Sequence, residues 1–213
     1  MIRLLAKLLL FVLLVAATAA GVLLTRSSDP QYTVADWMSW GRFQRYNAMI
    51  ADAARKNGVD PLLLKALVWR ESEFHPHKTG SSGERGLMQV SQGAADDWAR
   101  AHKVETFQPA DLFSPRMNLE IGAWYLKQKL NRWAAKDDPI PFALAEYNAG
   151  GTRVDRWIAL TQLGEGVTAA DLRSRIPFPS TRSYVETILR RRAYYEAQAK
   201  ADAEPEDAET QEK

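Results

Sequence analysis

The sequence contains no cysteine, and this absence excludes several kinds of chemistry. Without a thiol the chain forms no disulfide, builds no zinc site on cysteine, uses no thiol nucleophile and carries no lipid on a cysteine after a signal peptide. The redox compartment of the protein therefore cannot be inferred from its cysteine content.

An excess of charge of one sign is also lacking. The chain has 28 basic and 26 acidic residues, for a net charge of +2. Domains that bind nucleic acid usually carry a strong basic excess, so a nucleic-acid partner is not expected. No internal repeat is visible, and no segment shows the convincing alternation of apolar and polar residues that is typical of a strand.

Apolar residues are plentiful by contrast. The hydrophobic fraction is 46% and the charged fraction 25%, with seven residues each of Trp, Tyr and Phe. This composition is typical of a globular protein, and the length, once both ends are set aside, suits one domain. We expect a single hydrophobic core and a monomer.

The N-terminal end resembles an export segment. Arg3 and Lys7 precede an apolar run at residues 8–24, and a polar stretch follows it. Residues 17–19 have the small-x-small form of a signal cleavage site, yet the run is about 17 residues long, close to the lower limit for spanning a bilayer. Residues 1–27 are thus a signal peptide or a membrane anchor, and we favour the anchor. Either one would place the rest of the chain outside the cytoplasm.

The remaining sequence divides into three parts by composition. Residues 28–45 are expected to be a linker and N-terminal extension, and residues 46–200 the folded domain. Residues 201–213 are rich in Glu and nearly free of large apolar side chains, which predicts a disordered, solvated acidic tail.

The folded domain is predicted to be all-α. Three Asp-Pro or Ser-Pro pairs, at residues 60–61, 114–115 and 138–139, place an N-cap residue before a proline in the first helical position. The predicted helices span residues 43–57, 61–74, 92–102, 115–134, 139–149, 153–161, 168–175 and 181–200. Residues 80–90 contain three glycines and predict an ordered loop or a short hairpin.

One carboxylate interrupts an apolar helix face. Leu64, Leu67, Val68 and Glu71 fall on about one third of the circumference of the helix at residues 61–74. Burial at the C-terminal end of a helix would raise the pKa of this carboxyl group, and a protonated acid is what cleavage of a glycosidic bond requires. On this pattern alone, neutralisation of Glu71 by a basic neighbour such as Arg70 is an equally good interpretation.

Five segments in a fixed order favour the catalytic interpretation. They read Glu71-Ser72-Glu73-Phe74, Gly83-Glu84-Arg85-Gly86-Leu87-Met88-Gln89-Val90, Asn118-Leu119-Glu120-Ile121-Gly122-Ala123-Trp124-Tyr125-Leu126, Ala145-Glu146-Tyr147-Asn148-Ala149-Gly150 and Thr181-Arg182-Ser183-Tyr184-Val185. In this order and spacing they resemble the soluble-lytic-transglycosylase family of the lysozyme-like superfamily. The resemblance covers roughly residues 46–190.

The resemblance implies a lysozyme-like, all-α domain with a substrate groove, acting on peptidoglycan glycan strands on the periplasmic side of a bacterial envelope. It makes Glu71 the catalytic residue. The substrate-binding residues that it implies are Ser82, Met88, Gln89, Tyr147 and Asn148. For Met88 a core position is the more frequent role of such a residue. The amides of Gln89 and Asn148 suit sugar hydroxyl and N-acetyl groups, and the Tyr147 hydroxyl can hold the Glu71 carboxyl or the substrate oriented.

The resemblance also implies a reaction without water, metal or organic cofactor. Hydrolytic glycosidases usually pair two carboxylates across the scissile bond, and no convincing partner for Glu71 is found. Glu73 points away on the same helix, and Glu84 stands where the family usually has Ala. Lytic transglycosylases use one Glu as acid and then as base and leave a 1,6-anhydro-muramoyl end. Glu146 and Ser180 are further departures, since the family has a small residue and a Glu there.

Three other interpretations are available. A metal site at His75 and His77 has the wrong backbone for two ligands on one helix face. A goose-type lysozyme would be the hydrolytic alternative, and a non-catalytic peptidoglycan-binding module of an envelope complex is the alternative from another class. Residues 190–192 are three arginines that could contact peptidoglycan carboxylates, but a solvated helix face is the commoner meaning of such a run.

Overall fold

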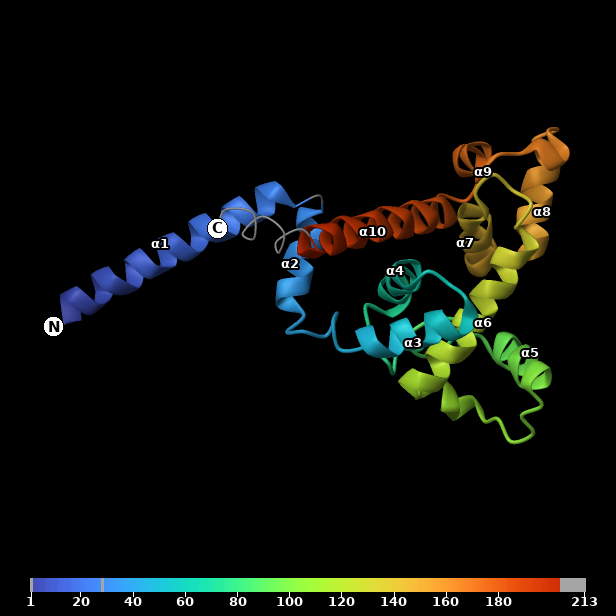
Figure 1. Cartoon of the computed structure of the whole chain (residues 1–213), viewed down its shortest axis with the longest axis horizontal. Helices are drawn as coiled ribbons and strands as arrows, with labels where there is room; N and C mark the ends of the chain where they lie inside the picture. The colour runs from blue at the N-terminus through green and yellow to red at the C-terminus, as the bar shows by residue number, and fades with distance from the viewer. Residues whose placement is uncertain (1, 28, 204–213) are drawn as a thin grey trace, which may run out of the picture. The chain divides into compact units, whose positions relative to one another are not determined.

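The computed structural model describes residues 2–27 and 29–203, and the chain divides into two compact units, Met1–Phe43 and Gln44–Lys213. Figure 1 shows the helices of both units. Residue 28 and most of the predicted acidic tail, from residue 204 onward, lie outside the described residues.

The first unit contains the helices α1 (Ile2–Arg26) and α2 (Pro30–Met38). Helix α2 lies where only a linker and extension is predicted, and it begins where Asp29 Oδ1 accepts a hydrogen bond from the backbone N–H of Tyr32, at 3.0 Å. The Tyr32 ring packs against Phe43, with 5.4 Å between ring centroids. Within residues 2–27 and 29–203, no helix combines the length and the apolar character needed to cross a membrane.

The second unit is built from helices, as predicted. Its α-helices are α3 (Asn47–Asn57), α4 (Pro61–Ser72), α5 (Gln92–His102), α6 (Pro115–Arg132), α7 (Pro139–Ala149), α8 (Gly151–Leu160), α9 (Ala169–Arg175) and α10 (Pro179–Ala203). Two short 3-10 helices, η1 (Pro109–Phe113) and η2 (Gly164–Gly166), were not predicted. The described part of this unit has no strand, only two isolated β-bridges. The all-α prediction is therefore confirmed.

Helix starts follow the predicted capping residues. Asp60 Oδ1 accepts from the N–H of Leu62 at 2.9 Å, and Asp138 Oδ1 accepts from the N–H of Ile140 at 3.0 Å. Ser114 makes no such side-chain bond. There the start is favoured by the proline that follows, whose fixed φ suits the first helical position.

Helix α10 contacts helices from both the first and the second half of the domain. It packs along α4 and α7, while α6 packs against α3, α5 and α7. Figure 1 shows α7, α8 and α9 grouped near the start of α10, and these three helices also contact one another. Residues from α4 and α10, far apart in the sequence, are thereby brought together.

Arginines of α10 contribute to its contact with α4. The guanidinium of Arg191 lies 4.2 Å from the centroid of the Trp69 ring, and Arg191 is only 3% exposed. Arg192 Nε forms an ion pair with Asp60 Oδ2 at 2.6 Å. The predicted solvated face is thus wrong for Arg191, because its planar guanidinium is buried by stacking on an aromatic ring.

Candidate active site

The local fold of α4 brings Glu71 to the edge of the core. Leu64, Leu67 and Val68 are fully buried, as the predicted apolar face requires. Glu71 continues this face in the last turn and is only partly exposed. The carboxyl group is thus placed at the edge of the apolar core, where its charged form is poorly solvated.

The helix ends two residues earlier than predicted. Glu73 and Phe74 have positive φ angles of 49° and 61°, and this left-handed backbone stops α4 at Ser72. The turn buries the Phe74 side chain completely and leaves Glu73 exposed beyond the helix end. Glu71 is therefore the carboxylate that α4 presents at the core edge, and Glu73 is not.

The carboxyl group of Glu71 accepts one short hydrogen bond. The Tyr184 hydroxyl donates to Glu71 Oε1 at 2.5 Å. Burial raises the pKa of Glu71 from 4.5 to about 7, although the Tyr184 hydrogen bond and the charges of Arg70 and Lys78 lower it and the charge of Glu84 raises it further. Near neutral pH this group can both donate and accept a proton.

Arg70 does not form an ion pair with Glu71 in the structure. In the described part of the chain Glu71 forms no ion pair within 4.0 Å. The guanidinium of Arg70 instead lies over the Tyr184 ring, 5.3 Å from its centroid. Arg70 acts on Glu71 only through its charge.

Tyr184 is a site residue that the sequence analysis did not single out. It comes from α10 and is only 2% exposed. Burial and the nearby charge of Glu71 raise the pKa of its phenol well above 10.0, so it remains a hydrogen-bond donor. Its only sequence signal was its place in the last of the five segments, because a contact across 113 positions leaves no local pattern.

The loop at residues 80–90 is fixed to α6 by one buried amide. Asn118 Oδ1 accepts from the N–H of Met88 at 2.7 Å, and its Nδ2 donates to the carbonyls of Arg85 and Leu112, each at 2.8 Å. At Gly86, with φ of 78°, a Cβ would overlap the Asn118 side chain. Glycine is thus required for this close approach.

Met88 and Tyr147 are joined by a hydrogen bond. The Met88 side chain is fully buried beside Gly122, where a Cβ would overlap its sulfur atom. The Met88 carbonyl accepts from the Tyr147 hydroxyl at 2.9 Å. Burial, followed by the charge of Glu71, raises the pKa of Tyr147 well above 10.0. Tyr147 is therefore near Glu71 but donates its proton to the loop, and the Glu71 carboxyl is held by Tyr184 instead.

Gln89 and Ser82 lie in the same loop. Gln89 has a φ of 46°, and its Nε2 donates to the carbonyls of Lys78 and Gly86 at 3.0 and 2.9 Å. Within the described residues, Gln89 Oε1 accepts no hydrogen bond. Ser82 is exposed, and its N–H donates to Glu84 Oε2 at 3.1 Å.

Asn148 lies in the last turn of α7. Its Oδ1 accepts from the Thr181 hydroxyl at 2.8 Å, which links α7 to α10. Both residues line a cavity of about 230 Å³. The other lining residues are Ala149, Arg153, Phe178 and Ser180. Thr181 precedes Tyr184 by three positions on α10, so this cavity lies along the helix that carries the partner of Glu71.

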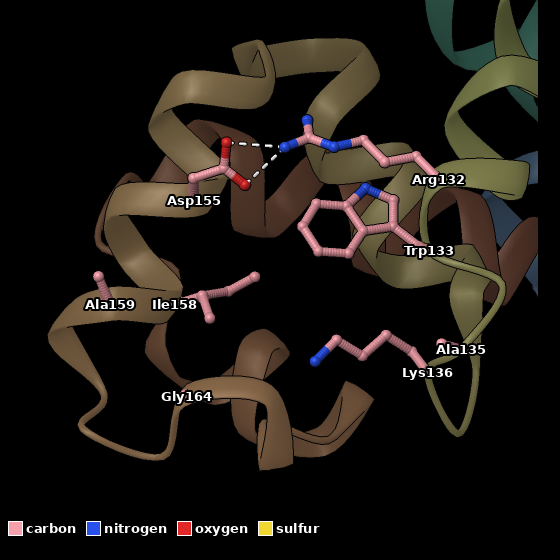
Figure 2. Close-up of a pocket in the computed structure, with 8 residues that line it drawn as sticks. All are labelled: Arg132, Trp133, Ala135, Lys136, Asp155, Ile158, Ala159 and Gly164. Carbon is pink, nitrogen blue, oxygen red and sulfur yellow. Dashed lines mark hydrogen bonds and ion pairs between the residues drawn. The ribbon is translucent and has the colours of Figure 1, made fainter.

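A second cavity of about 540 Å³ lies elsewhere in the domain and contains none of the predicted site residues (Figure 2). Arg132 Nη2 donates to both carboxylate oxygens of Asp155 at its edge, each at 2.7 Å. Figure 2 shows the Lys136 side chain extending toward the middle, opposite Ile158. The one carboxylate that lines this cavity, Asp155, is bound by Arg132. The Glu71 region is therefore the better candidate for acid–base chemistry.

Glu146, next to Tyr147, has a structural environment. It is 4% exposed and accepts from Lys129 Nζ at 3.1 Å, Arg132 Nη1 at 2.8 Å and Trp133 Nε1 at 2.8 Å. These contacts explain how a charged residue is tolerated where the resemblance predicts a small one.

The two histidines after α4 make separate contacts. His75 Nδ1 lies 2.9 Å from the Ser72 carbonyl oxygen, and the His77 ring lies 6.0 Å from the Phe113 ring. Residues 2–27 and 29–203 contain no group of three or more His, Cys, Asp or Glu side chains that could hold a metal ion.

Comparison with known proteins places this geometry in a family. Residues 48–166 match the transglycosylase SLT domain. The soluble lytic murein transglycosylase of Salmonella typhimurium strain LT2 is 30% identical over 151 residues, which are 70% of this chain and 23% of that protein. The chain spans about a quarter of the length of the first curated relatives that it matches.

Solved structures show the same fold. The 70 kDa soluble lytic transglycosylase of Escherichia coli has a TM-score of 0.64 and 27% identity, over 72% of this chain and 24% of that one. The lytic transglycosylase Slt of Pseudomonas aeruginosa, solved as an inactive mutant with Gln in place of a Glu, has a TM-score of 0.64 and 26% identity, over 74% and 25%. This chain belongs to the transglycosylase SLT domain family, within the lysozyme-like superfamily.

Proposed function

We propose that this chain is a peptidoglycan lytic transglycosylase, in which Glu71 cleaves the β-1,4 bond between N-acetylmuramic acid and N-acetylglucosamine without water. The observation that carries the proposal is the partly buried Glu71 carboxyl, with its pKa raised to about 7 and a hydrogen bond from Tyr184. The names of its relatives, soluble and membrane-bound lytic murein transglycosylases, support it.

In the first step the protonated Glu71 donates its proton to the leaving glycosidic oxygen. The oxygen of the substrate's own 2-acetamido group attacks the anomeric carbon as that bond breaks, so no second carboxylate is needed. In the second step the Glu71 carboxylate removes the proton of the sugar 6-hydroxyl, whose oxygen displaces the acetamido oxygen. A 1,6-anhydro ring forms, and Glu71 is protonated again.

The surroundings of Glu71 suit both roles. Burial favours the neutral acid that the first step requires. The Tyr184 hydroxyl, which donates at 2.5 Å, favours the carboxylate that the second step requires. A pKa near neutral pH lets one group alternate between the two states at little cost.

We further propose that the polar groups around Glu71 bind the glycan. Gln89 Oε1 and the Asn148 amide are suited to sugar hydroxyl and N-acetyl groups, and Ser82 is exposed on the same loop as Gln89. Tyr147 and Met88 are proposed to form part of the wall of the glycan-binding groove, where the Tyr147 hydroxyl donates to the Met88 carbonyl. The reaction is proposed to take place in the bacterial envelope, because a basic start and an apolar run precede the domain.

The experiment is digestion of purified peptidoglycan with the wild type and with Glu71→Gln, which keeps the side-chain size. We expect release of soluble muropeptides by the wild type and a loss of at least about a hundredfold in the variant. Glu73→Gln is the matched control, since it alters a nearby Glu that faces away, and it should digest at the wild-type rate. Equal rates for Glu71→Gln and the wild type would contradict the proposal.

A further inference from the structure

Two small cavities share Arg153 in their linings. One, the cavity of about 230 Å³ that Asn148 and Thr181 also line, is called the Arg153 cavity below. The other, of about 340 Å³, lies around the first residues of α8 and is also lined by Arg156. Neither lining contains an Asp or a Glu. The positive charge of Arg153 is therefore not offset by an acidic residue of either cavity.

The guanidinium of Arg153 is held in place by a backbone carbonyl and not by a carboxylate. Its Nη1 donates to the carbonyl of Ala149, four positions earlier, at 3.1 Å. In the part of the chain that the structure describes, Arg153 takes part in no ion pair. The residue is exposed, so its other N–H donors are accessible to a ligand in the cavity.

Ser180 lines the same cavity as Arg153 and stands where the resemblance predicts a Glu. A carboxylate at position 180 would share the cavity with the guanidinium, and such groups form strong, bidentate pairs. In this chain the residue is a short serine in the first turn of α10. The lining thus keeps the cation of such a pair without the anion, and an acidic group of a ligand would complete it.

The other lining residues suit a sugar. Asn148 Oδ1 accepts from the Thr181 hydroxyl at 2.8 Å, and within the described residues its Nδ2 donates no hydrogen bond. The Phe178 side chain is 50% exposed, and its ring centroid lies 5.7 Å from that of Trp157. Two packed rings present a rigid apolar surface. The cavity therefore combines an apolar wall, amide donors and one cation, which together fit a sugar that carries a carboxylate.

The Arg153 cavity also lies close to the Glu71 carboxyl. Thr181 and Tyr184 are three positions apart on α10, or roughly 4.5 Å along the helix axis. Tyr184 donates to Glu71 Oε1 at 2.5 Å. A glycan strand that reaches Glu71 is therefore expected to place a neighbouring sugar at this cavity.

We propose that the Arg153 cavity is a carboxylate subsite, in which Arg153 binds an acidic group carried by a muramic acid residue of the strand and thereby determines substrate preference. This inference rests on the proposed function of the chain. The carboxylate has two sources in peptidoglycan. In peptide-free strands it is the lactyl group of muramic acid, and in peptide-bearing strands it belongs to the stem peptide. Either presents two oxygens that suit the planar guanidinium.

The test is the affinity of four tetrasaccharides of alternating N-acetylglucosamine and N-acetylmuramic acid, measured by calorimetry on the full chain carrying Glu71→Gln to prevent cleavage. One has free lactyl carboxylates, and its partner has them converted to amides. The other two carry stem peptides, with free or amidated carboxylates. We expect an acidic ligand to bind roughly three- to tenfold more tightly than its own amide. The pair that shows the preference identifies the source of the carboxylate.

Variants in the same background connect the preference to the cavity. Arg153→Gln should abolish it by removing the cation, and Ser180→Glu should abolish it by placing a carboxylate beside the guanidinium. Ser180→Glu should fold, because a Glu is favourable in the first turn of a helix. Arg153→Lys should keep part of the preference. Arg156→Gln is the matched control, since Arg156 lies on the same helix but lines the neighbouring cavity and not this one, and it should keep the preference.

Three results would overturn the inference: equal affinity for acid and amide in both pairs, a preference that persists in Arg153→Gln, or no binding of any of the four ligands. The binding measurement does not depend on cleavage. If the acidic ligand is preferred while the wild type releases no muropeptides, the proposed reaction fails and the carboxylate subsite stands.

Discussion

The Tyr184 hydroxyl donates a 2.5 Å hydrogen bond to Glu71 Oε1 across 113 positions of sequence. Glu71 lies in the last turn of α4, and Tyr184 lies in the second half of the folded domain, on α10. The packing of α10 on α4 therefore completes the site, and neither helix provides it alone.

Removing this hydrogen bond should impair the base step. In Tyr184→Phe the Glu71 carboxylate loses its donor, so the pKa of Glu71 should rise above about 7. A hydrogen bond to a charged group is worth roughly 1.5–3 kcal/mol, and we expect kcat to fall by roughly ten- to a hundredfold. Steady-state kinetics on purified peptidoglycan measure the change in kcat. Tyr194→Phe, on the same helix, is the control, and an unchanged kcat in Tyr184→Phe would contradict the assigned role.

The wild-type pH profile should reflect Glu71 directly. Its pKa is raised to about 7, and the free enzyme must carry the proton to begin the reaction. We expect kcat/KM to fall about tenfold per pH unit above this value and to level off below it. Initial rates of peptidoglycan digestion at constant ionic strength test this. A fall centred near pH 4.5, the ordinary pKa of Glu, would show that the pKa of Glu71 is not raised.

Stability should depend on pH through the same group. The folded-state pKa of about 7 exceeds the ordinary 4.5, so folding binds a proton between these values and ionised Glu71 destabilises the fold at higher pH. The cost is absent below about pH 4 and fully present above about pH 8. Glu71→Gln cannot ionise, so it should be more stable than the wild type at pH 8 by on the order of 1–3 kcal/mol, with the difference vanishing near pH 4. Urea unfolding at both pH values measures this, and a constant difference would be inconsistent with it.

Glu146 should be important for stability. Glu146→Ala leaves Lys129 and the Trp133 indole without their buried acceptor, whereas Arg132 keeps Asp155. We expect a loss of roughly 3–5 kcal/mol, because removing one partner of a buried ion pair leaves uncompensated charge. The control is Asp155→Ala, whose side chain is 52% exposed and should cost less than about 1 kcal/mol. Thermal melting compares the two, and equal losses would count against the buried network.

Local patterns explain the part of the fold that the sequence predicts well. The Asp60 and Asp138 caps, the helix periodicity and the apolar face that ends in Glu71 each depend on residues within a few positions of one another. The early end of α4 was missed, because it depends on a left-handed backbone that buries Phe74.

Contacts between distant residues explain what the sequence could not predict. The Asn118 amide fixes a loop 30 positions away at Met88, and Tyr184 reaches Glu71 only through helix packing. Arg191, predicted to be solvated, is buried by the ring of Trp69 on another helix. These residues occur in the segments and runs that the sequence analysis quoted, yet their roles needed the three-dimensional structure.

The measurement that tests the central claim most directly is the mass of the muropeptides released from purified peptidoglycan. Transfer to the substrate's own 6-hydroxyl leaves anhydro ends, which are lighter by one water than the reducing ends of a hydrolase. We expect anhydro products from the wild type and none from Glu71→Gln. Reducing-end products would identify a goose-type lysozyme activity instead, and the absence of products from the folded wild type would indicate a binding module.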